Sequence, residues 1–226
     1  MLRAVRGINS PVFINKKQSA SDSGGNITLN LGLSIAEGDI AIVVYGWVST
    51  TDDAPSIVTS GYTTIAELYS NDTVDTNFLA AYKIMGPTPD GNVQVAGHGA
   101  NPTVAAVHVW RGVNTSTPMD VTATTATGVN TLTPNSPSIT PVTPGAIIIS
   151  LGVGAYSAGF ISTINTPSGM SNGVDGFSWN GTIGAVVGIA SFAWVSGAYD
   201  PSAWTSGGGG RSTDSWAAAT IALRPA

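Results

Sequence analysis

The sequence predicts an all-β protein, a two-sheet antiparallel β-sandwich with a jelly-roll-like arrangement. Only 9% of the 226 residues are charged, against about 25% in an average soluble domain, so Ser, Thr, Asn and Gly must cover most of the surface. Sheets and turns expose such residues, whereas helices usually expose Glu, Lys and Arg. The 28 Gly and 13 Pro residues suit a chain with many turns, and 42% apolar residues are enough for one continuous core.

Short β-rich runs separated by turn residues follow one another from residue 26 onward. They lie at 26–31, 39–48, 62–69, 76–85, 92–96, 103–111, 146–154, 184–195 and 213–223. No helical pattern interrupts them, which argues against alternating strand and helix units and favours a sandwich. A chain of this length fits one large β domain, which we place at 26–226.

Two of these runs indicate which side chains face the core. Nearly every position of 39–48 is apolar, which predicts a central strand that also holds Trp47 in the core. In 103–111, large residues such as His108 and Trp110 alternate with smaller ones, so one face should interdigitate with the opposite sheet. We therefore expect Trp110 to be buried between the sheets. The four prolines between 134 and 144 place that segment at an edge or in a crossing.

Residues 1–25 are predicted to form an extended N-terminal arm. They hold four basic residues and one acidic residue, a balance of +3, whereas the rest of the chain has a balance of −8. Such asymmetry is typical of an interacting tail. We expect the arm to bind a neighbouring subunit through Arg3, Arg6, Val12, Phe13, Ile14, Lys16 and Lys17.

The residues that catalysis or metal binding would need are scarce. Cys is absent, which removes thiolate nucleophiles and Cys-ligated metals, and His98 and His108 have no acidic partner close in sequence. The acidic stretch 71–77 lacks the ligand spacing of an EF-hand and is typical of a hairpin turn. The glycines at 207–210 lack the Lys of a phosphate-binding loop and indicate a flexible surface loop. We therefore expect no enzyme, no cofactor and no metal, although spacing alone would not reveal a carboxylate pair assembled by the fold.

Charge and hydropathy also limit the partners. The acidic main domain is a poor match for nucleic acid, because phosphate contacts need a clustered basic surface. No apolar run is long enough to cross a bilayer, and residues 1–10 lack the order of a secretory signal. We expect a protein made in the cytoplasm, without membrane insertion.

Three aromatic residues lie beside turn residues in predicted loops and could stack on a sugar or on a partner protein. They are Trp179, Tyr199 and Trp204. The alternative interpretation is that they are half-buried anchors of their loops.

Several motifs follow one another in a fixed order. An apolar strand follows Gly-Asp, a Gly-aromatic-Thr turn comes next, a Trp-Arg-Gly-Val strand end precedes Pro-Met-Asp, and the last strand ends at Arg-Pro. The segments are NITLNLGLSIAEGDIAIVVYGWVS (26–49), SGYTTI (60–65), FLAAYKIM (78–85), VAAVHVWRGV (104–113), PMD (118–120), GAIIISLG (145–152) and SWAAATIALRPA (215–226). In this order they resemble a loose group of phage and prophage virion structural proteins. The resemblance implies a β-sandwich component of a tail or capsid surface, without catalytic residues to carry over, and it does not extend to residues 1–25.

The sequence thus favours a multi-copy virion structural protein, a capsid decoration or head-fibre protein that its arm anchors to other virion proteins, and a homo-oligomer. Three alternatives stay open. One is a tail or baseplate component, another is a module that binds a carbohydrate or host receptor through its loop aromatics, and the third is a glycan hydrolase on a jelly roll.

Overall fold

The computed structural model describes residues 10–129, 133–157, 163–206 and 215–226. Within these ranges the chain forms strands and no helix. The strands are β1 (Val12–Ser21), β2 (Ile27–Asn30), β3 (Ile40–Ser49), β4 (Thr63–Ser70), β5 (Asp75–Ile84), β6 (Asn92–Val95), β7 (Thr103–Arg111), β8 (Thr124–Gly128), β9 (Ile147–Tyr156), β10 (Ile164–Asn165), β11 (Ser171–Trp179), β12 (Gly184–Ala193), β13 (Thr205–Ser206) and β14 (Trp216–Leu223).

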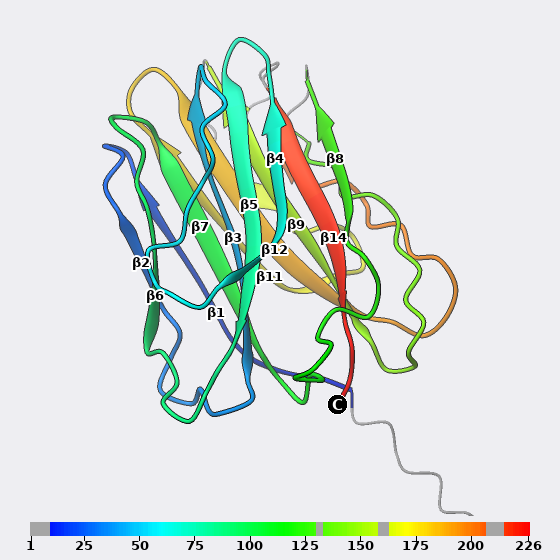
Figure 1. Ribbon diagram of the computed structural model, residues 1–226. Helices are drawn as coiled ribbons and strands as arrows, with labels where there is room; N and C mark the ends of the chain where they lie inside the picture. Colours follow the sequence, from blue (N-terminus) through cyan, green and yellow to red (C-terminus); the bar gives the residue numbers. More distant parts are fainter. Residues whose placement is uncertain (1–9, 130–132, 158–162, 207–214) are drawn as a thin grey trace, which may run out of the picture.

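Two five-stranded antiparallel sheets pack face to face, as Figure 1 shows. Sheet I has the strand order β1-β7-β3-β5-β4, and sheet II has the order β11-β12-β9-β14-β8. Every strand of sheet I comes from the first half of the chain and every strand of sheet II from the second half. The predicted antiparallel two-sheet β-sandwich is therefore confirmed.

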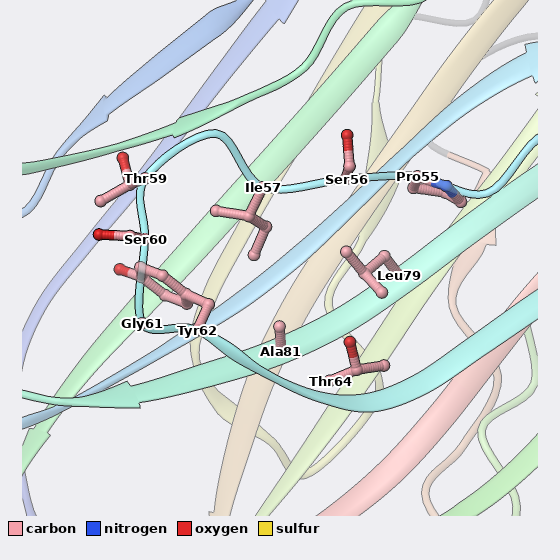
Figure 2. A pocket seen from close by; sticks show the side chains of 10 residues that line it. All are labelled: Pro55, Ser56, Ile57, Thr59, Ser60, Gly61, Tyr62, Thr64, Leu79 and Ala81. Carbon is pink, nitrogen blue, oxygen red and sulfur yellow. The ribbon is translucent and has the colours of Figure 1, made fainter.

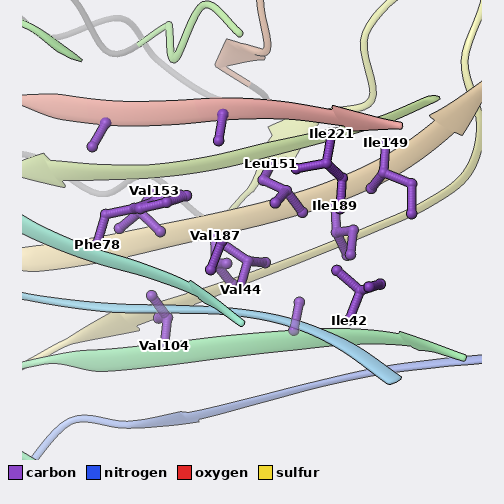
Figure 3. Close-up of a cluster of buried hydrophobic side chains, with 14 of the residues drawn as sticks. Ile42, Val44, Phe78, Val104, Ile149, Leu151, Val153, Val187, Ile189 and Ile221 are labelled. Carbon is purple, nitrogen blue, oxygen red and sulfur yellow. The ribbon is translucent and has the colours of Figure 1, made fainter. Parts of the chain in front are cut away.

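The main core lies between the two sheets, where alternate residues of each strand point inward. Figure 3 shows Ile42, Val44 and Phe78 from sheet I facing Leu151 and Val187 from sheet II. Trp110 is 2% exposed and belongs to this core, so its predicted burial is confirmed.

A second apolar layer covers the outer face of sheet I. The short strands β2 and β6 pair with each other and pack over Val43, Tyr45 and Trp47 of β3. All ten residues of β3 are buried as a result, which confirms the predicted central strand covered on both faces. On the outer face of sheet II, β10 pairs with β13, and Trp204 lies in an apolar cluster with Ile164 of β10.

The predicted N-terminal arm is wrong for residues 12–21. These residues form β1, which pairs with β7 along its length and is an edge of sheet I, so the domain boundary expected after residue 25 does not hold. A bulge between Phe13 and Asn15 shifts the register and breaks the alternation that would have marked a strand. The exposed Lys16 and Lys17 are the polar residues that an edge strand needs to discourage pairing with other chains. Residues 1–9 lie outside the described ranges.

The expected jelly-roll-like path is not confirmed. A jelly roll combines two Greek keys across its two sheets, whereas here each half of the chain completes one sheet before the next begins. Strand β11 was not expected either, because its Gly173 and Gly176 are unfavourable in strands.

Candidate functional site: an interaction surface at one end of the sandwich

An ion pair between an exposed arginine and a buried aspartate closes one end of sheet I. Arg111, the last residue of β7, donates from Nε to Oδ1 of Asp39 and from Nη2 to Oδ2, both at 2.8 Å. The Asp39 side chain is fully buried, and it also accepts the backbone N–H of Ala36 at 2.8 Å. The hydrogen bond and the negative charge of the Asp39 carboxylate raise the pKa of Arg111. The pair holds the turn before β3 against the end of β7.

A second ion pair lies at the same end of sheet II. Arg224, directly after β14, donates from Nε to Oδ1 of the buried Asp120 at 3.2 Å. Asp120 also accepts the backbone N–H groups of Val142 and Thr143, at 2.6 and 3.0 Å, and the Thr143 hydroxyl. Burial acts to raise the pKa of Asp120, but the hydrogen bonds from Thr143, Val142 and Arg224 outweigh it, so the pKa lies below its usual value. We call this part of the molecule the clamp end, after its two Arg–Asp pairs.

Both ends of the described chain lie at the clamp end, as Figure 1 shows. Val12 pairs with Arg111 at the start of β1, and the N–H of Ala226 donates to the carbonyl oxygen of Gly112 at 2.9 Å. A bridge between Val113 and Pro225 ties the segment after β7 to the segment after β14.

Exposed apolar side chains gather at the clamp end. Val12 is 60% exposed beside Arg111, and Leu33 is fully exposed beside Ser34, whose carbonyl oxygen accepts from Arg111. On the other sheet, Val142 is 65% exposed, and its backbone N–H donates to Asp120. Val195, two residues after the end of β12, is 82% exposed. Among the described residues, these are four of the six large hydrophobic side chains that are exposed. Because these four side chains share one end of the sandwich, and large exposed apolar patches mark interaction sites, this end is the candidate interaction surface.

The residues predicted to bind a partner from the arm are largely occupied within the domain. The ring of Phe13 packs edge-on against His108 and Trp110, with centroids 5.2 Å away in each case, and Ile14 packs against the cluster beneath β2 and β6. Nζ of Lys16 donates to the carbonyl oxygen of Gly173 at 2.5 Å, and Lys17 is exposed on β1. The expectation that Val12, Phe13 and Ile14 act together on a neighbour is therefore wrong, and only Val12 is exposed. Arg3 and Arg6 lie outside the described residues.

The predicted stacking role of Trp204 is wrong, because Trp204 is fully buried. Its ring lies over Gly188, where any larger residue would collide with it, and beside Gly152, where a Cβ would also press on Pro134. Its Nε1 donates to the Ser150 hydroxyl at 3.0 Å. The sequence suggested a loop because Pro and Asp precede Trp204, and it gave no sign of the two facing glycines.

Trp179 and Tyr199 are half-buried, and each already stacks on a ring of the domain. Trp179 stacks on Tyr156 with centroids 5.3 Å apart, and Tyr199 stacks on Phe192 at 4.0 Å. This arrangement fits loop anchors. Tyr199 belongs to one apolar cluster on sheet II with Trp194, the residue before the exposed Val195.

A cavity of about 250 Å³ lies on the outer face of sheet I, beneath the segment before β4. Figure 2 shows its apolar lining, with Leu79 and Ala81 on β5 and Ile57 on the covering segment. Hydroxyl-bearing residues surround this apolar lining: Ser56, Thr59, Ser60, Tyr62 and Thr64. No charged side chain lines this cavity, so its chemistry suits a small neutral molecule.

The two histidines do not form a common site. Nε2 of His98 lies 3.3 Å from Oδ2 of Asp53, and its ring stacks on Trp47. His108 is fully buried in β7, where Nε2 lies 3.0 Å from the carbonyl oxygen of Asn172 and Nδ1 has no partner. Across the described ranges, no three His, Asp or Glu residues lie close enough to hold a metal ion. The same ranges contain no helix that is long and apolar enough to cross a membrane.

The buried His108 should make stability depend on pH. Burial lowers the pKa of His108 to about 3, whereas an unfolded His titrates near 6.5. Below pH 6.5 the unfolded chain therefore binds a proton that the folded protein excludes, and the free energy of unfolding should fall by up to about 1.4 kcal/mol per pH unit. Urea denaturation between pH 7 and 5 measures this slope, which His108→Val should remove. An equal slope in the variant would contradict the assignment.

The fold and these sites define an all-β, two-sheet antiparallel sandwich with a clamped, apolar end. A scan against protein-family models found no match, and searches of curated proteins and of solved structures found none either.

Proposed function

We propose that this protein is a virion structural protein whose sandwich is displayed on a phage particle and attached through the clamp end. The observation that carries the proposal is that, among the described residues, four of the six exposed large apolar side chains lie at that end. A displayed domain needs one adhesive end, and the rest of its surface must remain soluble.

The motifs that resemble virion proteins support the same proposal. Four of the segments that carry the resemblance build the two clamps and their bridges: Gly38-Asp39, Arg111-Gly112-Val113, Pro118-Met119-Asp120 and Arg224-Pro225. Met119 pairs with Leu223, and the N–H of Arg224 donates to the carbonyl oxygen of Pro118. The resemblance therefore involves residues with a common structural task at the proposed attachment end. A capsid decoration protein is our preferred form, and a tail component would use the same end.

Changing the clamp end should detach the protein without unfolding it. The double variant Leu33→Asp/Val195→Asp alters two exposed side chains, so its melting temperature should stay close to that of the parent. Burying one such side chain in an interface contributes about 1.5 to 3 kcal/mol, so incorporation should fall at least about tenfold. Immunoblots of gradient-purified particles of the phage that encodes the protein measure incorporation.

The matched control is Val58→Asp, which changes a 52% exposed valine beside the cavity, away from both clamps. It should be incorporated like the parent. The attachment proposal fails if the protein is missing from purified particles, or if the double variant is incorporated at the normal copy number.

A second candidate function is binding of a neutral saccharide, which the cavity on sheet I favours. Its apolar lining suits the C–H face of a sugar ring and its surrounding hydroxyls suit the ring's polar groups. On a glycan array, we expect the parent to bind neutral glycans, and Thr64→Trp, which fills the cavity, to lose that signal. Thr63→Trp is the control, since Thr63 is exposed and does not line the cavity. Absence of any parent signal, or equal signals from all three proteins, would reject this function.

A further inference from the structure

We infer that the chain is a tandem of two copies of one five-stranded unit, packed against each other as the two subunits of a symmetric dimer are. The inference concerns residues 12–111 and 124–223 and does not depend on the proposed function. In chain order, the strands of unit 1 are β1, β3, β4, β5 and β7, and those of unit 2 are β8, β9, β11, β12 and β14.

The two sheets have the same topology. Numbering each unit's strands from first to fifth, sheet I runs first-fifth-second-fourth-third, from β1 to β4. Sheet II, taken from β8 to β11, also runs first-fifth-second-fourth-third. All neighbours are antiparallel in both sheets. Sequential strands usually lie side by side in a sheet, so the shared non-sequential order is evidence of a common unit.

The register agrees along the central strands. Ile40 at the start of β3 pairs with Ile84 and Trp110, and Ile147 at the start of β9 pairs with Ala193 and Leu223. Four residues further on, Val44 pairs with Ala80 and Ala106, and Leu151 pairs with Ile189 and Ala219. The pairing thus advances in step through three strands of each unit.

Local sequence features recur at matching positions. Gly38 lies two residues before β3 and Gly145 two residues before β9. Their φ angles are 81° and 83°, a conformation that favours glycine. Thr73-Val74 and Thr182-Ile183 precede the two fourth strands, and Val74 and Ile183 both pack into the main core.

The two Arg–Asp clamps extend this correspondence. Trp110, which pairs with the first residue of β3, directly precedes Arg111. Leu223, which pairs with the first residue of β9, directly precedes Arg224. Each arginine binds a buried Asp that also accepts backbone N–H groups from the turn before β3 or β9, one at Asp39 and two at Asp120. The aspartates come from different segments, since Asp39 belongs to its own turn and Asp120 to the segment between the units. The two units therefore have the same Arg–Asp arrangement, although the aspartate comes from a different position in the chain.

The packing between the sheets has the pattern of an isologous interface, in which the same surface serves on both sides. Strand β3 lies against β9, so the second strands meet each other. Strand β1 lies against β11 and β4 against β8, so the first strand of each unit meets the third strand of the other. Likewise β7 lies against β12 and β5 against β14, which pairs the fifth strand of each unit with the fourth of the other. The inner face of each unit is thus an interaction surface whose partner is a unit of the same kind.

A cut between the units should leave two pieces that each carry one complete sheet. A protease site inserted after Thr115, in the exposed turn of the segment between β7 and β8, makes this cut in the folded, full-length protein. After denaturation and removal of denaturant, the pieces should form one complex that elutes like the uncut protein and regains its tryptophan fluorescence.

The control carries the same site after Pro87, in the exposed segment between β5 and β6. This cut puts β7 on a different piece from β1 and β3, although β7 lies between them in sheet I. Recovery of the native complex should therefore be at least several-fold lower than after the cut at Thr115. Equal recovery, or better recovery for the control, would overturn the inference.

A second variant protects the test against a harmful insertion. A circular permutant that begins at Thr122, with Ala226 joined to Met1, reverses the order of the units and keeps every residue. It should melt within a few degrees of the parent and refold faster than a permutant that begins at Thr88, which splits unit 1 and raises the sequence separation of its contacts. If the permutant that begins at Thr88 melts at the same temperature and refolds as fast as the one that begins at Thr122, the chain does not consist of two such units.

Discussion

Trp110→Ala should lower the free energy of unfolding by about 3 to 5 kcal/mol, because truncating a buried Trp removes apolar contacts and leaves a cavity. The indole is 2% exposed in the main core, and the Phe13 ring packs edge-on against it at 5.2 Å. The loss is a large share of a typical stability of roughly 5 to 15 kcal/mol. Urea denaturation with fluorescence or circular dichroism measures it.

Trp110→Phe is the control for this prediction. The buried Nε1 of Trp110 has no hydrogen-bond partner, so Phe removes an unsatisfied N–H while keeping an aromatic ring in the core. We expect its loss of stability to be clearly smaller than that of Trp110→Ala. A Trp110→Ala variant as stable as the parent would mean that the indole is not in the core.

Asp120→Ala should destabilise the isolated protein by about 1 to 3 kcal/mol or more, the usual effect of leaving buried hydrogen-bond donors without an acceptor. The carboxylate is fully buried and joins Arg224 to the backbone of Val142 and Thr143. Without it, these N–H groups and the guanidinium lose their acceptor, and the clamp on sheet II opens.

The lowered pKa of Asp120 adds a pH signature. A carboxyl group with a depressed pKa contributes stability above its unfolded pKa, and that stability is lost as pH falls through the folded pKa. The difference in stability between parent and Asp120→Ala should therefore shrink in acid. Asp52→Ala, at an exposed position, should change stability by less than about 0.5 kcal/mol, and a similar effect from both variants would contradict the clamp.

The main strands and their faces could be predicted because their residues are locally consistent. The segments that became β3 and β7 combine β-branched and aromatic residues with a clear burial pattern. The edge strands could not be predicted in the same way. In β1, a bulge breaks the alternation and exposed lysines imitate a polar tail, and in β11 two glycines and a second bulge weaken the signal.

The candidate site was less accessible to sequence reasoning, because its parts come from distant segments. Asp39 and Arg111, or Asp120 and Arg224, are joined only by the fold. The motifs of the sequence contain all four residues, but their spacing does not show which Asp binds which Arg. Trp204 was misassigned for a related reason, since its burial depends on Gly152 and Gly188 in two other strands. The repeated unit was also hidden, because its evidence lies in strand order and register while little of it lies in residue identity.

The proposed attachment of the sandwich to a virion through the clamp end is tested most directly by a cryo-electron microscopy reconstruction of particles of the phage that encodes the protein. We expect density for the two-sheet sandwich on the particle surface, with Val12, Leu33, Val142 and Val195 at the contact and the turns at 71–74 and 180–183 pointing into solvent. Particles that lack this density, or a sandwich attached by the end that holds those turns, would contradict it.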